Sequence, residues 1–264
     1  MTSTDWSARA EDAAVALRRR LGVEAVDAVV VLGSGWGGAA DAFGTPRAEV
    51  AVAELPHFLA PVAVGHAGLA RAYDVNGRTV LALLGRTHLY EGHGAGQVAH
   101  AVRTAAAAGA RIALLTNANG SLRADWGTGT GVLIADHLNL SGSTPLVGPQ
   151  FVDLTEAYSP RLRAIARAAD PALVEGTYAM LRGPHYETVA EAHALQRLQA
   201  DVLGMSTVLE TIAARAAGLE VLGLSVVTVV EATGEVIDPD EVVAAAERAA
   251  TGLGPVLRHV CSTY

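Results

Sequence analysis

The sequence feature that most constrains the fold is a short apolar run, residues 27–32, that ends directly in a glycine-rich stretch, residues 33–38. The run is rich in valine, which favours a buried strand, and the glycines favour a tight loop after it. Similar apolar runs recur between helical segments at residues 111–116, 131–135 and 220–229. This alternation predicts one α/β domain over residues 1–264, with a central mixed β-sheet flanked by helices.

Local signals mark several element boundaries. Asn76-Gly77 separates two apolar runs and predicts a two-residue hairpin between residues 67–75 and 79–84. Thr207-x-x-Glu210 is a capping box and opens a helix that Gly218 ends. Asp238 as N-cap and Pro239 at the first helical position open the last helix. Other helices are expected at residues 6–21, 95–108, 159–169 and 188–199.

Composition excludes several classes of function. Of the 264 residues 51% are apolar, enough for a sizeable core, and the net charge of -8 disfavours general nucleic-acid binding. The lone Cys261 rules out an internal disulfide or a cysteine metal cluster, and no H-E-x-x-H pattern indicates a zinc site. No run approaches the roughly 18 apolar residues of a membrane span. Acidic residues interrupt any signal-peptide pattern near the N-terminus, so we expect a cytoplasmic protein without a membrane partner.

The glycine-rich stretch, Gly33-Ser34-Gly35-Trp36-Gly37-Gly38, has three interpretations. It matches the dinucleotide fingerprint, it can cradle a phosphate with Ser34 as an extra donor, or it is a turn without a ligand. A dinucleotide site needs an acidic residue about 20 positions later, after a crossover helix. Glu49 and Glu54 are available, but residues 39–48 are too short and Pro-interrupted for that helix. An NAD-dependent dehydrogenase is therefore disfavoured.

A second candidate follows the strand that ends near Leu84. Arg86 and His88 alternate in residues 85–93, so their side chains point to one side if the chain is extended. Arginine binds phosphate bidentately, and histidine adds a hydrogen bond or a second charge. The alternative is a solvated strand end.

Three further segments carry weaker signals. Residues 116–120 place small polar side chains at a strand's carboxyl end, where open α/β sheets bind ligands, although an ordinary turn explains them too. Tyr186 and Glu187 can meet a base by stacking and hydrogen bonding, or simply begin a helix. Ser206 precedes the capped helix, where backbone N–H groups attract anions, or it is only part of a cap.

Taken together and in this order, the motifs resemble those of the trimeric purine nucleoside phosphorylases, in their actinobacterial branch. The resemblance covers nearly the whole chain and rests on the segments GSGWGG, VGHAG, GRTHLYEGH, LLTNANG, DHLNLSG, FVDLTEAYSPRL, GPHYETVAEA and GMSTVLETIAARAAG. It implies cleavage of the base–sugar bond of a purine nucleoside by inorganic phosphate, without a metal or an organic cofactor. It also implies a homotrimer.

The resemblance also implies roles for individual residues. Phosphate would be bound by Ser34, His66, Arg86, His88, the Ala118 backbone N–H and Ser206. Ribose would be held by Tyr90, Met205 and a neighbouring subunit's Phe151. The base would meet Tyr186, Glu187 and the strand end at Thr228; Val229 and Glu231 are added as candidate base-binding residues from their positions on the same strand. Among these, His88 and Glu187 are the implied catalytic residues.

Four positions depart from the family pattern. Val229 occupies the place of an asparagine that hydrogen-bonds the purine, and Pro239 aligns with a histidine often found near the ribose 5′-hydroxyl. Asn119 and Ser121 stand where alanine and glycine are usual. These departures leave the expected phosphate site intact and alter the base and 5′ sites.

Glu231 lies two residues after Val229 and faces the same side if the strand continues. A carboxylate there would accept from a 6-amino group or a protonated N7; the alternative is a solvent-facing Glu231 beyond the strand. We expect weak activity on inosine and guanosine relative to other members, and better use of 6-amino or 5′-modified nucleosides. A phosphorylase for 5′-deoxy-5′-substituted adenine nucleosides and a catalytically weak nucleoside-binding homologue are the alternatives.

Overall fold

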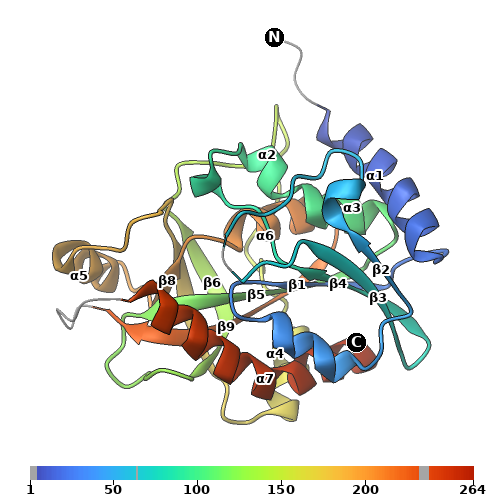
Figure 1. Ribbon diagram of the computed structural model, residues 1–264. Coiled ribbons are helices and arrows are strands. Elements are labelled where there is room, and N and C mark those ends of the chain that lie inside the picture. Colours follow the sequence, from blue (N-terminus) through green and yellow to red (C-terminus); the bar gives the residue numbers. More distant parts are fainter. Residues whose placement is uncertain (1–4, 64, 232–237) are drawn as a thin grey trace.

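The computed structural model describes residues 5–63, 65–231 and 238–264, and of Pro239 the backbone only. Nine strands in these ranges form one mixed sheet in the order β2-β3-β4-β1-β5-β8-β7-β6-β9 (Figure 1). Their bounds are β1 Ala28–Leu32, β2 Ala48–Ala51, β3 Leu69–Val75, β4 Arg78–Leu84, β5 Ile112–Ser121, β6 Gly131–Asn139, β7 Val174–Met180, β8 Val202–Gly204 and β9 Glu220–Val230. The fold class expected from the sequence is confirmed.

The sheet has an open half and a closed half. In the open half, β1 runs parallel to β4 and β5, while β2, β3 and β4 are antiparallel neighbours. In the other half, β9 pairs with β6 and also with β5, so that β5, β8, β7, β6 and β9 close into a ring. β5 belongs to both halves and therefore ends where they meet.

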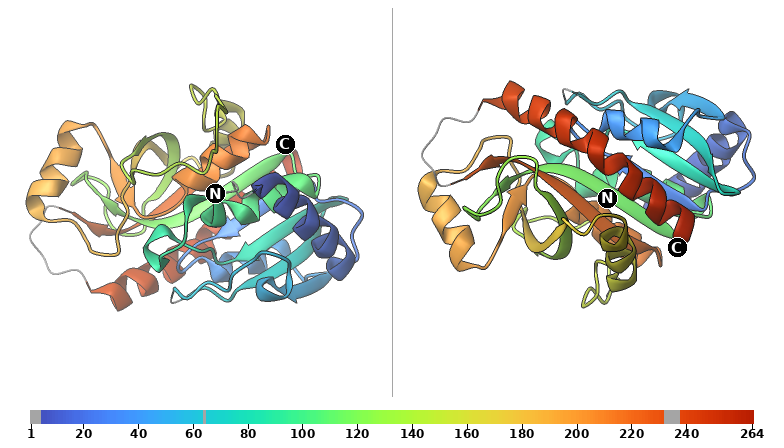
Figure 2. Two further views of the ribbon diagram at one scale, coloured as in Figure 1. Left: turned by 90° about the horizontal axis from the view of Figure 1, so that it is seen from above. Right: turned by 90° about the horizontal axis from the view of Figure 1, so that it is seen from below.

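Helices cover both faces of the sheet, as Figure 2 shows. α1, α3 and α6 pack on one face; α4, the long α7 and the 3₁₀ helix η1 pack on the other. The helices are α1 Trp6–Leu21, α2 Ala95–Val98, α3 His100–Ala107, α4 Pro160–Ala169, α5 Val189–Arg197, α6 Val208–Ala216 and α7 Pro239–Thr263. The 3₁₀ helices are η1 Gly37–Phe43, η2 Val52–Glu54 and η3 Leu89–Glu91.

Strand β1 shows why its sequence is apolar throughout. Val29 and Val31 join the core beneath α1, α3 and α6, whereas Val30 and Leu32 join the core beneath η1 and α7. Because both faces of the strand are covered, every residue of β1 is buried.

Most expected elements form, with informative differences. Asn76 and Gly77 have φ values of 53° and 79° and link β3 to β4, as a two-residue hairpin turn requires. The helix expected at residues 95–108 is interrupted at Ala99, which separates α2 from α3. The strand expected at residues 111–116 continues to Ser121, because β9 pairs with it along this whole length. In the part of the chain described, no helix is both long and apolar enough to span a membrane.

Candidate active site

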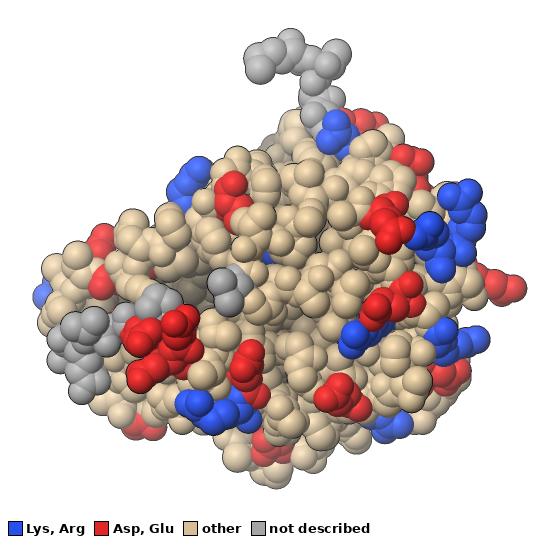
Figure 3. Space-filling view, in the orientation of Figure 1, with Lys and Arg blue, Asp and Glu red and all other residues tan. Residues whose placement is uncertain are grey.

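A cavity of about 240 Å³ lies where β1, β4, β5, β8 and β9 end and where α7 begins. Figure 3 shows a hollow in this face of the molecule. Over the face as a whole, basic side chains are scattered among acidic ones. The cavity brings together most of the residues selected from the sequence, and those that line it are Ser34, Arg86, His88, Tyr90, Ala118, Tyr186, Met205, Ser206, Thr228, Val229 and Glu231.

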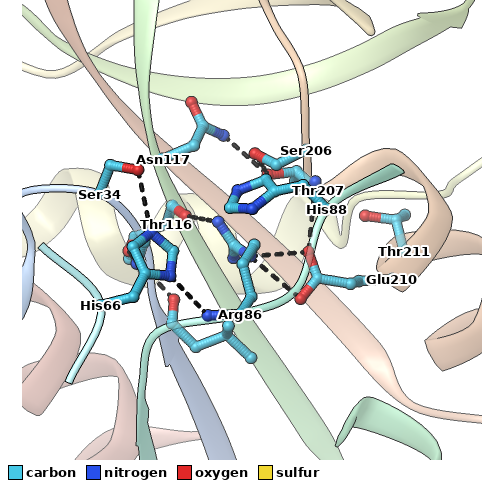
Figure 4. A network of polar contacts seen from close by, with 12 residues as sticks. Ser34, His66, Arg86, His88, Thr116, Asn117, Ser206, Thr207, Glu210 and Thr211 are labelled. Atoms are coloured by element: carbon cyan, nitrogen blue, oxygen red, sulfur yellow. Dashed lines mark hydrogen bonds and ion pairs between the residues drawn. The ribbon is translucent and has the colours of Figure 1, made fainter. Parts of the chain in front are cut away.

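Arg86 is the only arginine or lysine among the described residues that line this cavity. Its Nε lies 3.0 Å from a Glu210 carboxylate oxygen, and its Nη1 donates to the Thr116 carbonyl oxygen at 2.5 Å (Figure 4). Both side chains of the ion pair are almost fully buried. Nη2 is buried and has no hydrogen-bond partner among the described residues. A fixed, buried guanidinium with one unused nitrogen is suited to binding an anion.

Glu210 performs two tasks at once. Its carboxylate accepts from the Thr207 backbone N–H at 3.2 Å, which completes the expected capping box at the start of α6. The same carboxylate holds Arg86. Sequence reasoning assigned Glu210 only to the cap, because an ion pair between positions 124 residues apart leaves no local signal.

His66 orients Ser34 through a chain of hydrogen bonds. The Arg86 backbone N–H donates to His66 Nδ1 at 2.8 Å, so Nδ1 carries no proton and the proton lies on Nε2. Nε2 lies 3.0 Å from Ser34 Oγ and donates to it, which leaves the Ser34 hydroxyl hydrogen for another acceptor. Burial, with the nearby His88 and Arg86, lowers the pKa of His66 to about 3. His66 is therefore neutral, and both of its ring nitrogens are engaged.

His88 is oriented by a carboxylate that sequence reasoning missed. Its Nδ1 lies 2.9 Å from a Glu91 oxygen, and its backbone N–H donates to the same oxygen at 2.8 Å. Nδ1 therefore donates to Glu91, and Nε2 is left for the cavity that His88 lines. Although burial opposes it, these hydrogen bonds hold the pKa of Glu91 below its usual value. The i,i+3 spacing within residues 85–93 was the available signal.

At the end of the cavity that contains Arg86 and His88, β5 and the start of α6 form a further wall. The Asn117 side chain donates to Thr207 Oγ1 at 2.9 Å and accepts from Ser225 Oγ at 2.7 Å. Thr207 has a φ of 73°, an unusual conformation for a β-branched residue, and several hydrogen bonds hold it in place. Ser206, beside it, is buried at the N-terminal end of α6. Its hydroxyl and the helix end both favour a negative charge.

The other end of the cavity is acidic. A bulge in the β5–β9 pairing, where Asn119 pairs with Val227 and Gly120 with Val229, brings both Thr228 and Val229 to the cavity. Glu231 also lines it, is only 7% exposed and packs over Gly120, where a Cβ atom would collide with its carboxylate. The solvent-facing alternative for Glu231 is therefore wrong.

The pKa values of Glu231 and Glu187 are both raised at this end of the cavity. Burial, and next the charge of Glu187, raise the pKa of Glu231 to about 7. Burial also raises the pKa of Glu187, whose two carboxylate oxygens are buried without a hydrogen-bond partner in the described part of the chain. This end of the cavity therefore favours a ligand that donates hydrogen bonds or accepts a proton.

Some predicted site residues lie outside the cavity lining. His66 lies behind Ser34, and Glu187 borders the acidic end without lining it. Phe151 is 97% exposed and lies by a separate surface hollow of about 530 Å³, next to α1, α3 and α6. Pro239 begins α7, but its side chain lies outside the described part.

The two other departures from the family pattern are buried. The Asn119 amide has no partner for its oxygen or nitrogen among the described residues. Ser121 donates from its hydroxyl to the Arg123 carbonyl oxygen at 2.9 Å. No group of three metal-ligating side chains gathers within the described ranges.

Comparisons with known proteins agree on one family. The model of the phosphorylase superfamily matches residues 27–261. The chain is 54% identical to the purine nucleoside phosphorylase of Mycobacterium tuberculosis, over 97% of this chain and 96% of that protein. Isoform 2 of the Schistosoma mansoni purine nucleoside phosphorylase, solved with cytosine and ribose-1-phosphate, has a TM-score of 0.89 at 30% identity and covers 97% of this chain and 96% of its own. A Schistosoma mansoni purine nucleoside phosphorylase solved with adenosine has a TM-score of 0.86 at 27% identity, with 96% of each chain covered.

Proposed function

Because the chain belongs to the phosphorylase superfamily and, within it, to the purine nucleoside phosphorylases of the actinobacterial branch, we propose that its cavity binds inorganic phosphate at the Arg86 end and a purine nucleoside toward Glu231. The enzyme is a pentosyltransferase: it converts a purine nucleoside and phosphate into free base and pentose 1-phosphate. Phosphate is the co-substrate, and the reaction uses no cofactor. The family predicted from the sequence is confirmed.

The unused Nη2 of Arg86 is the single observation that carries the phosphate assignment. It belongs to a buried cation that Glu210 and Thr116 hold on two sides, so the guanidinium is fixed at the cavity with one nitrogen left without a partner among the described residues. The Ser34 and Ser206 hydroxyls, the His88 ring and the Ala118 backbone N–H line the same cavity and complete a set of donors. His66 contributes by orienting Ser34.

The geometry supports a displacement at the anomeric carbon. As the bond to the base breaks, the sugar gains positive charge, and an adjacent phosphate both stabilises that charge and supplies the attacking oxygen. Donors fixed in advance around phosphate place it without reorganisation, which is the largest contribution such a pocket makes to rate. Tyr90 and Met205 also line the cavity and would hold the ribose. Tyr186, Glu187, Thr228, Val229 and Glu231 would surround the base.

The start of α7 favours a second, related substrate class. Val242 and Val243 line the cavity and give this wall an apolar surface. An apolar 5′ substituent would be tolerated there, as in a 5′-deoxy-5′-substituted adenine nucleoside. The Schistosoma mansoni enzyme solved with adenosine is a relative that holds a 6-aminopurine nucleoside.

Assembly, location and domain extent complete the proposal. The Phe151 ring is exposed and lies by a hollow on the surface of the chain. An exposed aromatic ring of this kind supports a homotrimer in which Phe151 reaches the sugar site of a neighbouring subunit. We further propose a cytoplasmic enzyme whose residues 1–264 form one catalytic domain.

A nucleoside panel tests the function directly. Purified protein would be incubated with inosine, guanosine, adenosine and 5′-methylthioadenosine, with and without phosphate, and free base measured by chromatography. We expect release of base only with phosphate. Base release independent of phosphate would contradict the proposal, and absence of release from every nucleoside would support the alternative of a catalytically weak binding protein.

A further inference from the structure

Displacement chemistry fixes where the base must lie. Phosphate attacks the anomeric carbon from the side opposite the departing base, so the base lies away from Arg86. The polar residues at that end of the cavity include Thr228, Tyr186 and Glu231. The Thr228 hydroxyl already donates to the Asn119 carbonyl oxygen at 3.0 Å. The Asn119 amide lines the same cavity without a partner among the described residues, but an amide only shares its hydrogens, so Tyr186 and Glu231 are left as the acids that could release a proton to the base.

Glu231 is held in place by its backbone and by Gly120. Its N–H donates to the Ser121 carbonyl oxygen at 2.7 Å, which continues the β5–β9 pairing one residue beyond β9. Its side chain packs against Gly120, where no larger residue leaves it room. Glu231 follows β9, and both of these contacts are with β5, so its carboxyl group is held in position as the donors at the phosphate end are.

Around Glu231, the segment before α5 and the start of α7 contribute acidic groups, and His185 in that segment acts on Glu187. Tyr186 and Glu187 come from the segment between β7 and α5, Asp238 caps α7, and β5 presents the uncharged Gly120. Burial and then Glu231, Glu187 and Asp238 raise the pKa of the Tyr186 hydroxyl, so all three carboxyl groups act on one ring. Within the described ranges no cation pairs with Glu231. A buried acid among acids and without a cation retains its proton.

We propose that Glu231 is a catalytic residue that donates its carboxyl proton to the departing purine, an inference that rests on the proposed phosphorolysis. As the bond between C1′ and N9 breaks, its electron pair moves into the imidazole ring, and N7 takes the Glu231 proton. A phosphate oxygen forms the new bond to C1′. The products are a neutral base, pentose 1-phosphate and a Glu231 carboxylate, which solvent then reprotonates.

The proposal explains the loss of an amide at Val229. A valine methyl cannot donate to the base, so activation of the leaving group needs another donor nearby. Val229 and Glu231 line the same cavity. General-acid catalysis of this kind contributes about 10²–10⁴-fold in rate. A protonated carboxyl group therefore does more than the missing amide, because it gives up a proton rather than only sharing one.

The pH dependence follows from the acidic surroundings. Since the pKa of Glu231 is raised to about 7, the group carries its proton below that pH and loses it above. The rate with an unmodified nucleoside should therefore fall as the pH rises through about 7. In Glu187→Gln the neighbouring charge is gone, so this fall should move to lower pH.

The decisive experiment compares two leaving groups in Glu231→Ala. One substrate is the best unmodified nucleoside of the panel; the other is its N7-methylated counterpart, whose base leaves neutral without receiving a proton. We expect Glu231→Ala to lose about a hundredfold or more in kcat with the first and far less with the second. Equal losses with both substrates would overturn the proposal and leave Glu231 a merely structural residue.

Two further variants control the pH profile. Glu231→Gln keeps the shape of the side chain but cannot release a proton, so the fall in rate near pH 7 should disappear. Glu241→Gln removes a charge from an exposed position in the first turn of α7 and should keep the wild-type profile. A profile that persists in Glu231→Gln would refute the role of Glu231. Failure of the wild type to release base from any nucleoside would instead refute the phosphorylase itself.

Discussion

Replacing Arg86 with alanine should damage the protein in two separable ways. The first concerns stability, because Glu210 is 1% exposed and would lose the cation it faces. Removing one partner of a buried ion pair typically lowers the free energy of unfolding by about 3–5 kcal/mol. Against a total of about 5–15 kcal/mol for an ordinary domain, this loss is large.

The second effect concerns phosphate. One charge-assisted hydrogen bond, that of Nη2, is worth about 1.5–3 kcal/mol, which corresponds to roughly tenfold to a hundredfold in catalytic efficiency. The double variant Arg86→Ala/Glu210→Gln separates the two effects. It no longer buries an uncompensated charge, so we expect it to recover much of the stability and none of the activity.

The assay measures both quantities on the same preparations. Urea unfolding at one chain concentration gives the midpoint for wild type, single and double variants, and initial rates at varied phosphate give kcat/KM for phosphate. A single variant as stable as wild type would show that Glu210 tolerates isolation. A double variant with the wild-type kcat/KM for phosphate would refute the assignment of Arg86.

Three further outcomes are expected. Val229→Asn should restore a hydrogen bond to a 6-oxopurine and raise inosine cleavage relative to adenosine by about tenfold, given about 1–3 kcal/mol for a buried unpaired group; an unchanged ratio contradicts this. Phe151→Ala should raise KM for the nucleoside, and mixing it with Arg86→Ala/Glu210→Gln should recover activity in shared assemblies; sedimentation showing a fully active monomer argues against it. Acid should destabilise the fold, because burial lowers the pKa of His66 to about 3 and of His100 to about 4 from 6.5. These groups stay neutral when folded, so stability is full above about pH 6.5 and falls below it, by up to about 1.4 kcal/mol per pH unit each. Glu231 offsets part of this loss: because its pKa is raised to about 7 in the folded protein, its contribution to the free energy of unfolding grows as the pH falls below about 7. His100→Gln should reduce the slope of unfolding free energy against pH; an unchanged slope contradicts the assignment.

The elements that could be predicted from the sequence are those whose ends are set by turn or capping residues close to them in the chain. The hairpin at Asn76-Gly77, the capping box at Thr207 and the end of α1 follow from turn and cap chemistry. The sequence did not indicate β8, because three residues carry no usable periodicity and the strand forms only where β5 and β7 flank it. The closing of the ring likewise depends on pairing between β5 and β9, which are about a hundred residues apart.

The same distinction holds for the site. Ser34, Arg86, His88 and Ser206 were found because each sits in a recognisable segment, and the structure brings them to one cavity. Glu210, which orients the Arg86 side chain, lies 124 residues away and no short motif indicates that contact, whereas His66, which orients Ser34, was selected from its own segment but as a phosphate ligand. Glu231 was expected to face solvent in the alternative interpretation because it follows the strand, but Gly120 and the segment before α5 cover it.

The position of β5 in both halves of the sheet has a consequence for exchange with solvent. β9 pairs with one edge of β5 along residues 112–121, while β1 at residues 112–115 and β8 at residues 120 and 121 pair with the other edge, so releasing all of its amides requires both halves to separate. We therefore expect residues 112–118 to exchange hydrogen for deuterium only through global opening, long after the segment before α5 has exchanged. The cavity would then have a rigid side, formed by β5 at the phosphate end, and a side that opens more often, formed by the segment before α5. Nucleosides could enter and leave past that segment while the phosphate-binding residues keep their positions.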